Sequence, residues 1–120
     1  STSYDQYTGV DVSKTAIQNF NKIKNKKTRL IVSDLSRYRT KEKFDLIIFS
    51  ESLYYFENTK KIIEKYEKFL LKKGMIVISV FEEDRTKDIW EKIPESLSII
   101  DSVSINNNGL TWRIKLFDKV

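Results

Sequence analysis

The sequence contains neither cysteine nor histidine, and these two absences exclude several kinds of site. Without cysteine the chain can form no disulfide, thiolate metal site or cysteine nucleophile. Without histidine it cannot by itself build an imidazole zinc site, a serine triad or imidazole acid–base catalysis. We therefore expect no metal site in this chain.

Long apolar runs are also lacking. None reaches the roughly 18 residues that a membrane-spanning helix needs, and the residues from Ser1 to Asp5 do not have the pattern of a signal peptide. Hydrophobic residues nevertheless make up 40% of the 120 residues, which is enough for one buried core. We expect a single cytoplasmic domain, residues 1–120, with no membrane partner.

The positive charge is concentrated in one region. The formal net charge is +5, but the stretch from Lys22 to Lys43 holds nine basic and two acidic residues, a local +7 that leaves −2 for the remainder. Such a stretch can attract nucleic acid, yet lysine-rich surfaces are also ordinary solubilising surfaces. A nucleic-acid partner is therefore not expected, and a nucleic-acid-modifying domain is kept only as a second alternative.

Apolar patterning alternates between strands and helices along the chain. Strands are predicted at 7–12, 29–32, 44–49 and 75–81, the last two as nearly continuous apolar runs typical of buried strands. Helices are predicted after Ser13, after Asn58 or Thr59, and as a short segment before Pro94. The second helix has an apolar stripe that extends to Phe69 and Leu70, and Gly74 suits its C-terminal cap.

The chain ends in a predicted β-hairpin. Two strand-like segments, 97–105 and 110–117, flank an Asn108-Gly109 pair, which is a strong hairpin signal. Strands alternating with helices require parallel pairing, whereas the hairpin adds antiparallel pairing. The fold class is therefore α/β, a three-layer, mostly parallel sheet with a C-terminal antiparallel hairpin.

Polar side chains follow three of the predicted strands. Asp11 and Asp34 come at or just after the first two, and Ser50-Glu51-Ser52 follow the third. In open α/β sheets ligands bind beyond the carboxyl ends of the strands, and a carboxylate there can accept hydrogen bonds from ribose hydroxyls or an adenine amino group. Aspartate is also a common turn former, so the joint spacing counts for more than any one acid.

The order of these segments resembles the class I S-adenosylmethionine-dependent methyltransferases, a Rossmann-like family. Residues 7–13, 32–35, 44–56 and 70–78 are similar to its motifs around strands two to five, and Ser50-Glu51-Ser52-Leu53-Tyr54-Tyr55 resembles the form seen in bacterial nodulation-protein-S-like N-methyltransferases. The resemblance implies a sheet order of 3-2-1-4-5-7-6 and S-adenosylmethionine as cofactor. It also implies a set of cofactor-binding residues: Asp11 on the ribose, Val12 against adenine, Asp34 and Leu35 near the adenine amino group, and Ser50.

The same motif also suggests residues that contact the substrate. Glu51 is a candidate to orient a substrate amine or accept a proton, and Tyr54 and Tyr55 are candidates for the wall of an acceptor pocket. Each also has a structural interpretation, as a hydrogen-bonding acid or as core aromatics. Methyl transfer needs positioning more than a covalent intermediate, so the lack of histidine and cysteine is compatible with it.

The chain departs from the family in one respect. None of its glycines belongs to a Gly-x-Gly segment, and Ser1 to Gln6 are too few for the first strand, its glycine-rich loop and a helix. We expect a truncated domain, either part of a longer product or a naturally shortened relative, that is inactive alone. In the family's sheet the first strand lies between strands two and four, so its absence leaves unpaired strand edges. We expect these edges to be closed by direct pairing of strands two and four, by a homo-oligomer or by a partner segment.

The sequence therefore leaves two principal functions. The first is S-adenosylmethionine-dependent methyl transfer to a small-molecule amine or hydroxyl. The alternative is a non-catalytic Rossmann-like binding or assembly module.

Overall fold

The computed structural model describes residues 7–11, 28–32, 35–53 and 56–120. The chain divides into two compact units, Ser1–Thr40 and Lys41–Val120. The single domain expected over residues 1–120 stays a prediction.

The first unit contains two short parallel strands. β1 (Tyr7–Asp11) pairs with β2 (Thr28–Val32) in a register that sets Tyr7 opposite Thr28 and Asp11 opposite Val32. Both strands were predicted from their β-prone residues, and both are confirmed. Parallel strands need a crossover connection, and the helix predicted to follow Ser13 lies outside the described residues.

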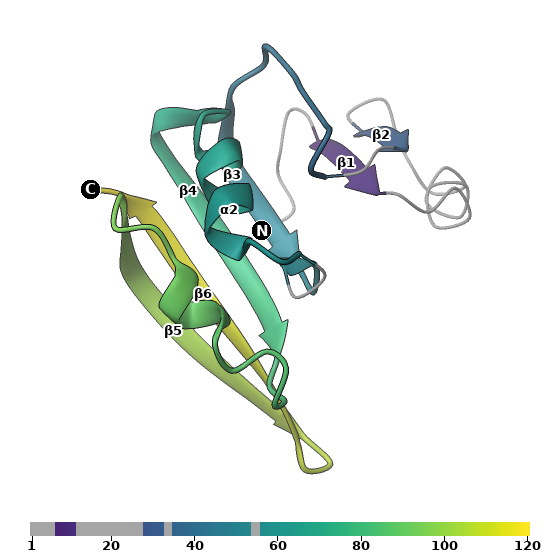
Figure 1. Ribbon diagram of the computed structural model, residues 1–120, viewed down its shortest axis with the longest axis vertical. Helices are drawn as coiled ribbons and strands as arrows, with labels where there is room; N and C mark the ends of the chain where they lie inside the picture. The colour runs from purple at the N-terminus through teal and green to yellow at the C-terminus, as the bar shows by residue number, and fades with distance from the viewer. Residues whose placement is uncertain (1–6, 12–27, 33–34, 54–55) are drawn as a thin grey trace. The chain divides into compact units, whose positions relative to one another are not determined.

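The second unit is built on a four-stranded sheet with the order β3-β4-β6-β5 (Figure 1). The strands are β3 (Phe44–Ser50), β4 (Leu70–Phe81), β5 (Leu97–Asn107) and β6 (Leu110–Lys119). β3 and β4 are parallel, whereas β6 is antiparallel to both β4 and β5. This mixed sheet confirms the predicted α/β class and matches the 4-5-7-6 part of the order that the family resemblance implied.

One face of this sheet is covered by two helical segments, α2 (Thr59–Glu67) and the 3₁₀ turn η2 (Ile89–Lys92). Ile63 of α2 and Ile76 and Ile78 of β4 are completely buried. The ring of Tyr66 meets that of Phe49 edge-on, with centroids 5.5 Å apart. The predicted helix after Asn58 and the short helical segment before Pro94 are thus both present, and they enclose the core of the unit.

The end of α2 differs from the prediction. The apolar stripe suggested a helix through Phe69 and Leu70 with a cap at Gly74, but α2 ends at Glu67 and β4 begins at Leu70. The reason is tertiary: the carbonyl of Phe69 accepts a hydrogen bond from the backbone N–H of Phe44, at 2.7 Å, and Leu70 is buried. Gly74 therefore lies inside β4 and is not a helix cap.

The C-terminal hairpin agrees with its sequence signal. Asn108 and Gly109 have φ values of 52° and 79°, the two positive angles of a type I′ turn. This turn lets β5 and β6 pair along almost their whole length, from Asn107 opposite Leu110 to Leu97 opposite Lys119. Both strands are longer than predicted, because the pairing continues into polar residues at either end.

Candidate functional site

The carboxyl end of the first unit's sheet holds one predicted cofactor residue in a defined backbone position. Asp11 is the last residue of β1 and stands opposite Val32, the last residue of β2. Leu35 is half-buried in the turn that follows β2. Val12 and Asp34 lie outside the described residues. In this unit, parallel pairing thus brings the two strand ends to one edge, as the predicted site requires.

The carboxyl end of β3 holds the other predicted residues that the structure describes. Ser50 is the last residue of β3; its side chain is exposed, and it stands opposite Ser79 of β4 in the parallel ladder. Glu51 follows directly. Tyr54 and Tyr55 lie outside the described residues, so their predicted role at the acceptor pocket stays a prediction.

Glu51 has an uncommon backbone conformation, and each of its carboxylate oxygens accepts a hydrogen bond. Its φ is 51°, in the left-handed region that non-glycine residues seldom occupy. One carboxylate oxygen accepts from the hydroxyl of Ser79, at 3.2 Å, and the other accepts from the backbone N–H of Phe81, at 2.8 Å. The Glu51 backbone N–H donates to the carbonyl of Ser79, at 2.9 Å. The glutamate thereby ties the end of β3 to the end of β4.

The end of β4 is also held from the loop that follows it. The hydroxyl of Thr86 donates to the carbonyl of Phe81 and accepts from the backbone N–H of Glu83, the latter at 3.0 Å. Thr86 is only 1% exposed, so these bonds are shielded from water. Sequence reasoning missed both Ser79 and Thr86; the hydroxyl of Ser79 within an otherwise apolar strand was the one available signal.

The segment that follows Glu51 is held by the burial of Leu53 and by hydrogen bonds at the start of α2. Leu53 is completely buried, and its carbonyl accepts a hydrogen bond from the hydroxyl of Thr59, at 3.5 Å. The side chain of Asn58 accepts from the backbone N–H of Lys61, at 3.1 Å, and caps α2. The loop between β3 and α2 is thus fixed at both ends, by Glu51 at its start and by the helix cap at its finish.

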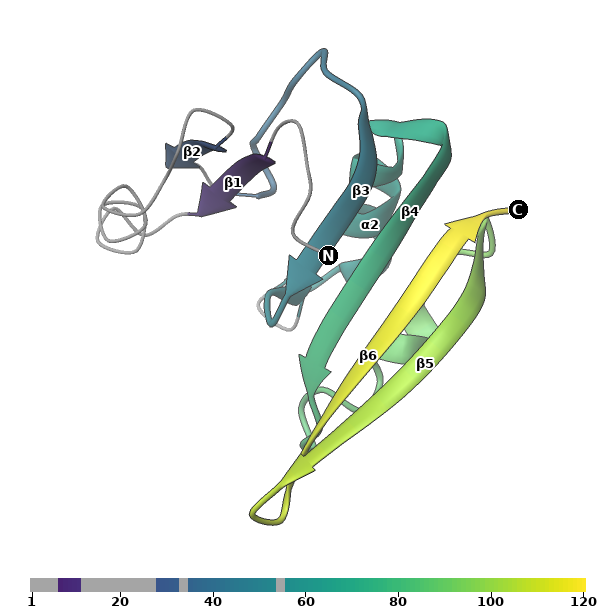
Figure 2. The ribbon, with the colours of Figure 1, turned by 180° about the vertical axis from the view of Figure 1, so that it is seen from behind.

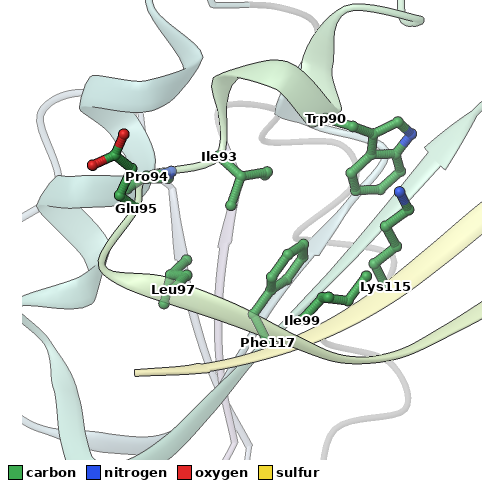
Figure 3. A pocket seen from close by; sticks show the side chains of 8 residues that line it. All are labelled: Trp90, Ile93, Pro94, Glu95, Leu97, Ile99, Lys115 and Phe117. Atoms are coloured by element: carbon green, nitrogen blue, oxygen red, sulfur yellow. The ribbon is translucent and has the colours of Figure 1, made fainter. Parts of the chain in front are cut away.

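A separate pocket lies between η2 and the β5–β6 hairpin. Its volume is about 310 Å³, and the ammonium of Lys115 stands 4.4 Å from the ring centre of Trp90. Figure 3 shows Phe117 and Ile93 pointing into the same space. The full lining is Trp90, Ile93, Pro94, Glu95, Leu97, Ile99, Lys115 and Phe117. None of these is a predicted site residue, and the pocket lies beside the start of β5 and the second half of β6.

The described part of the chain shows neither a cluster of metal ligands nor a membrane-spanning helix. Residues 7–11, 28–32, 35–53 and 56–120 contain no group of three or more carboxylates placed to hold a metal ion. In the same ranges no helix has the length and apolar character to cross a membrane. Residues 22–27 of the basic stretch from Lys22 to Lys43 lie outside these ranges.

The chain matches a family and a curated relative. A model of the family described as "Methyltransferase domain" matches residues 2–112. Malonyl-[acyl-carrier protein] O-methyltransferase 2 of Ilyobacter polytropus is 32% identical over 94 residues, which is 77% of this chain and 35% of that relative. The chain thus spans about a third of the length of the relative.

Solved structures share the fold. N-methyltransferase NodS from Bradyrhizobium japonicum, in complex with S-adenosyl-L-homocysteine, superposes with a TM-score of 0.79 at 22% identity, covering 95% of this chain and 66% of that one. The 1,6-didemethyltoxoflavin-N1-methyltransferase of Burkholderia thailandensis gives 0.75 at 15% identity, covering 93% and 60%. At these identities the likeness establishes the Rossmann-like fold.

Proposed function

The chain belongs to the methyltransferase-domain family, as the resemblance of its motifs predicted, and from this premise we propose that it takes part in methyl transfer from S-adenosylmethionine to an amine or hydroxyl of a small molecule. The observation that carries the proposal is the family match over residues 2–112. The curated relative is an O-methyltransferase and NodS is an N-methyltransferase, which is why both acceptor chemistries are kept. We further propose a cytoplasmic location.

The described strand ends suit the adenosine part of this cofactor. Asp11 ends β1, where a carboxylate can accept from both ribose hydroxyls, and the exposed Ser50 ends β3 with a hydroxyl that can donate or accept. We assign Val12, Asp34 and Leu35 to the adenine side by the resemblance. None of the three glycines stands in a Gly-x-Gly segment, so the proposed residues hold adenosine and not the methionine part.

The chemistry asked of these side chains is positioning. When bound, S-adenosylmethionine supplies a methyl group already activated by a positively charged sulfur. The chain's own residues would hold the adenosine, orient the acceptor nitrogen or oxygen and exclude water, which accounts for much of the rate of such transfers. Tyr54 and Tyr55 are proposed for the acceptor wall.

The sheet of the second unit also suggests a partner. β3 is an edge strand of that sheet, and Figure 2 shows the face of the sheet opposite α2. Exposed apolar side chains on this face include Leu46, Ile48 and Ile105. Exposed apolar faces and strand edges favour association. We propose that a second copy or a partner segment covers this face.

Titration calorimetry with S-adenosylhomocysteine tests the proposed cofactor site. We expect the folded chain to bind it and Asp11→Ala to weaken binding by about tenfold or more, the effect of losing a charge-assisted hydrogen bond. Asp45→Ala is the matched control, because this exposed acid lies near the amino end of β3, away from the carboxyl end that is proposed to face the cofactor. No measurable heat from the folded wild-type chain would favour the non-catalytic binding module instead.

A further inference from the structure

Glu51 ends β3 in a conformation that is unfavourable for its residue type. A φ of 51° costs free energy for any residue except glycine, because the Cβ approaches the neighbouring carbonyl. Such a conformation persists only where the surrounding structure compensates for it. The compensation here comes from the hydrogen bonds of Glu51 to β4.

The carboxylate of Glu51 substitutes for backbone at the end of the parallel ladder. The last register pair is Ser50 opposite Ser79, after which β3 turns away. The backbone N–H of Phe81 would then face β3 without a carbonyl, but it donates to the Glu51 carboxylate at 2.8 Å. The other carboxylate oxygen accepts from the Ser79 hydroxyl at 3.2 Å. One side chain thus lets β3 end early while β4 stays paired.

Both polar groups of Phe81 are held by side chains. Its N–H is bound by Glu51 and its carbonyl by Thr86. The end of β4 is therefore fixed on the side of β3 and on the side of the following loop. Ser50, next to Glu51, takes its position from the same arrangement, because the Glu51 backbone N–H is bonded to the carbonyl of Ser79 at 2.9 Å.

We propose that Glu51 is a positioning residue of the candidate site: its carboxylate acts as a hydrogen-bond acceptor for Ser79 and Phe81, and so fixes Ser50 at the carboxyl end of β3. This rests on the proposed function, since Ser50 is assigned there to the cofactor. The site requires the hydrogen-bond acceptor geometry of the Glu51 side chain, held by the positive φ of its backbone, and does not require its negative charge.

Substituting Glu51 separates these two properties. Glu51→Gln removes the charge, but the amide oxygen can still accept from Phe81 and the amide nitrogen can donate to the Ser79 hydroxyl, which both accepts and donates. Glu51→Gly removes both side-chain hydrogen bonds and also removes the Cβ, so it avoids the strain that an alanine would retain at positive φ. Glu57, which is exposed in the same loop, provides Glu57→Gln and Glu57→Gly as matched controls.

Two measurements are needed on these variants: the affinity for S-adenosylhomocysteine by calorimetry, and the exchange rate of the Phe81 amide by NMR. We expect Glu51→Gly to weaken the affinity by about tenfold and to speed exchange by about tenfold, because it removes both side-chain hydrogen bonds. Glu51→Gln should restore both to within about threefold of wild type, and the Glu57 variants should match wild type.

Two results would overturn the proposal. If Glu51→Gln were as weak as Glu51→Gly, the charge and not the acceptor geometry would be required. If Glu51→Gly matched wild type, the hydrogen bonds would be irrelevant to the site. A wild-type chain that does not bind S-adenosylhomocysteine would contradict the proposed function, and the exchange of the Phe81 amide would then decide alone whether Glu51 holds the strand end.

Discussion

At the scale of single residues, Gly74 lies so close to Leu70 and Leu71 that a side chain at this position would not fit. A Cβ built on Gly74 would lie 2.5 Å from Cδ1 of Leu70 and 3.0 Å from the carbonyl oxygen of Leu71. Leu70 is itself buried, so it cannot rotate away without opening the core. Gly74 does not have the positive φ of a helix cap. Glycine is thus needed here for space and not for backbone freedom.

We predict that Gly74→Ala destabilises the chain by about 1–3 kcal/mol, the usual effect of overpacking a buried site. In an unstrained strand the same substitution would be mildly stabilising, so the sign of the change tests the contact. Urea denaturation measures it. Lys73→Ala, at the exposed neighbouring position, should change the free energy of unfolding by less than about 0.5 kcal/mol. A stabilised Gly74→Ala would contradict the close approach.

At the scale of elements, the loop from β3 to α2 depends on how the helix begins. Asn58 caps α2 through its side-chain oxygen, at 3.1 Å from the backbone nitrogen of Lys61. Thr59, the first helical residue, is buried and bonds back to the Leu53 carbonyl. The sequence allowed either Asn58 or Thr59 as the N-cap of this helix, and the structure shows that the cap is Asn58. The helix start therefore holds the loop that follows Glu51.

We predict that Asn58→Ala lowers the free energy of unfolding by about 1 kcal/mol, because it leaves a first-turn N–H without its acceptor. Asn58→Asp keeps an acceptor oxygen and should retain most of the stability. Thermal unfolding followed by circular dichroism distinguishes the two variants. If Asn58→Asp were as unstable as Asn58→Ala, the hydrogen bond to Lys61 would not be the source of the effect.

At the scale of the whole molecule, the described helical segments cover only one of the two faces of the second unit's sheet. Alternation along β3 sets Phe49 toward α2 and Ile48 toward the other face, where Ile48 is 53% exposed. On the same face Phe81 and Trp112 contact each other, with ring centres 5.3 Å apart. An apolar face of this kind favours a partner.

We predict that the chain, with a monomer mass of 14.2 kDa, runs as a larger species in size-exclusion chromatography with light scattering. Ile48→Lys places a charge on the exposed face, where association would desolvate it, and should shift the mass toward the monomer. Lys61→Glu, on the exposed side of α2, should leave the mass unchanged. A folded wild-type chain that stays monomeric up to high concentration would contradict association through this face.

Much of the fold could be predicted from local patterns. The apolar runs around Ile47 and Ile78 predicted the strands β3 and β4, but burial on both faces is not found for β3. β3 is an edge strand of its sheet, and Leu46 and Ile48 are 45% and 53% exposed. Asn108-Gly109 predicted the hairpin, because these two residues tolerate the positive φ angles of a type I′ turn. The polar residues after the strands marked the carboxyl ends of two separate strands, β1 of the first unit, which ends at Asp11, and β3 of the second, which ends at Ser50.

What the sequence determined by itself is the order of the described strands and helical segments and the family, since these follow from propensity, periodicity and short motifs. What only the tertiary structure decided depends on groups far apart in the chain. The helix α2 ends at Glu67 because the Phe69 carbonyl pairs with Phe44, and Glu51 is a strand-end anchor because Ser79 and Phe81 lie beside it. No local pattern carries such contacts, because hydrogen bonds across about 25 to 30 residues exist only once β3 and β4 are paired.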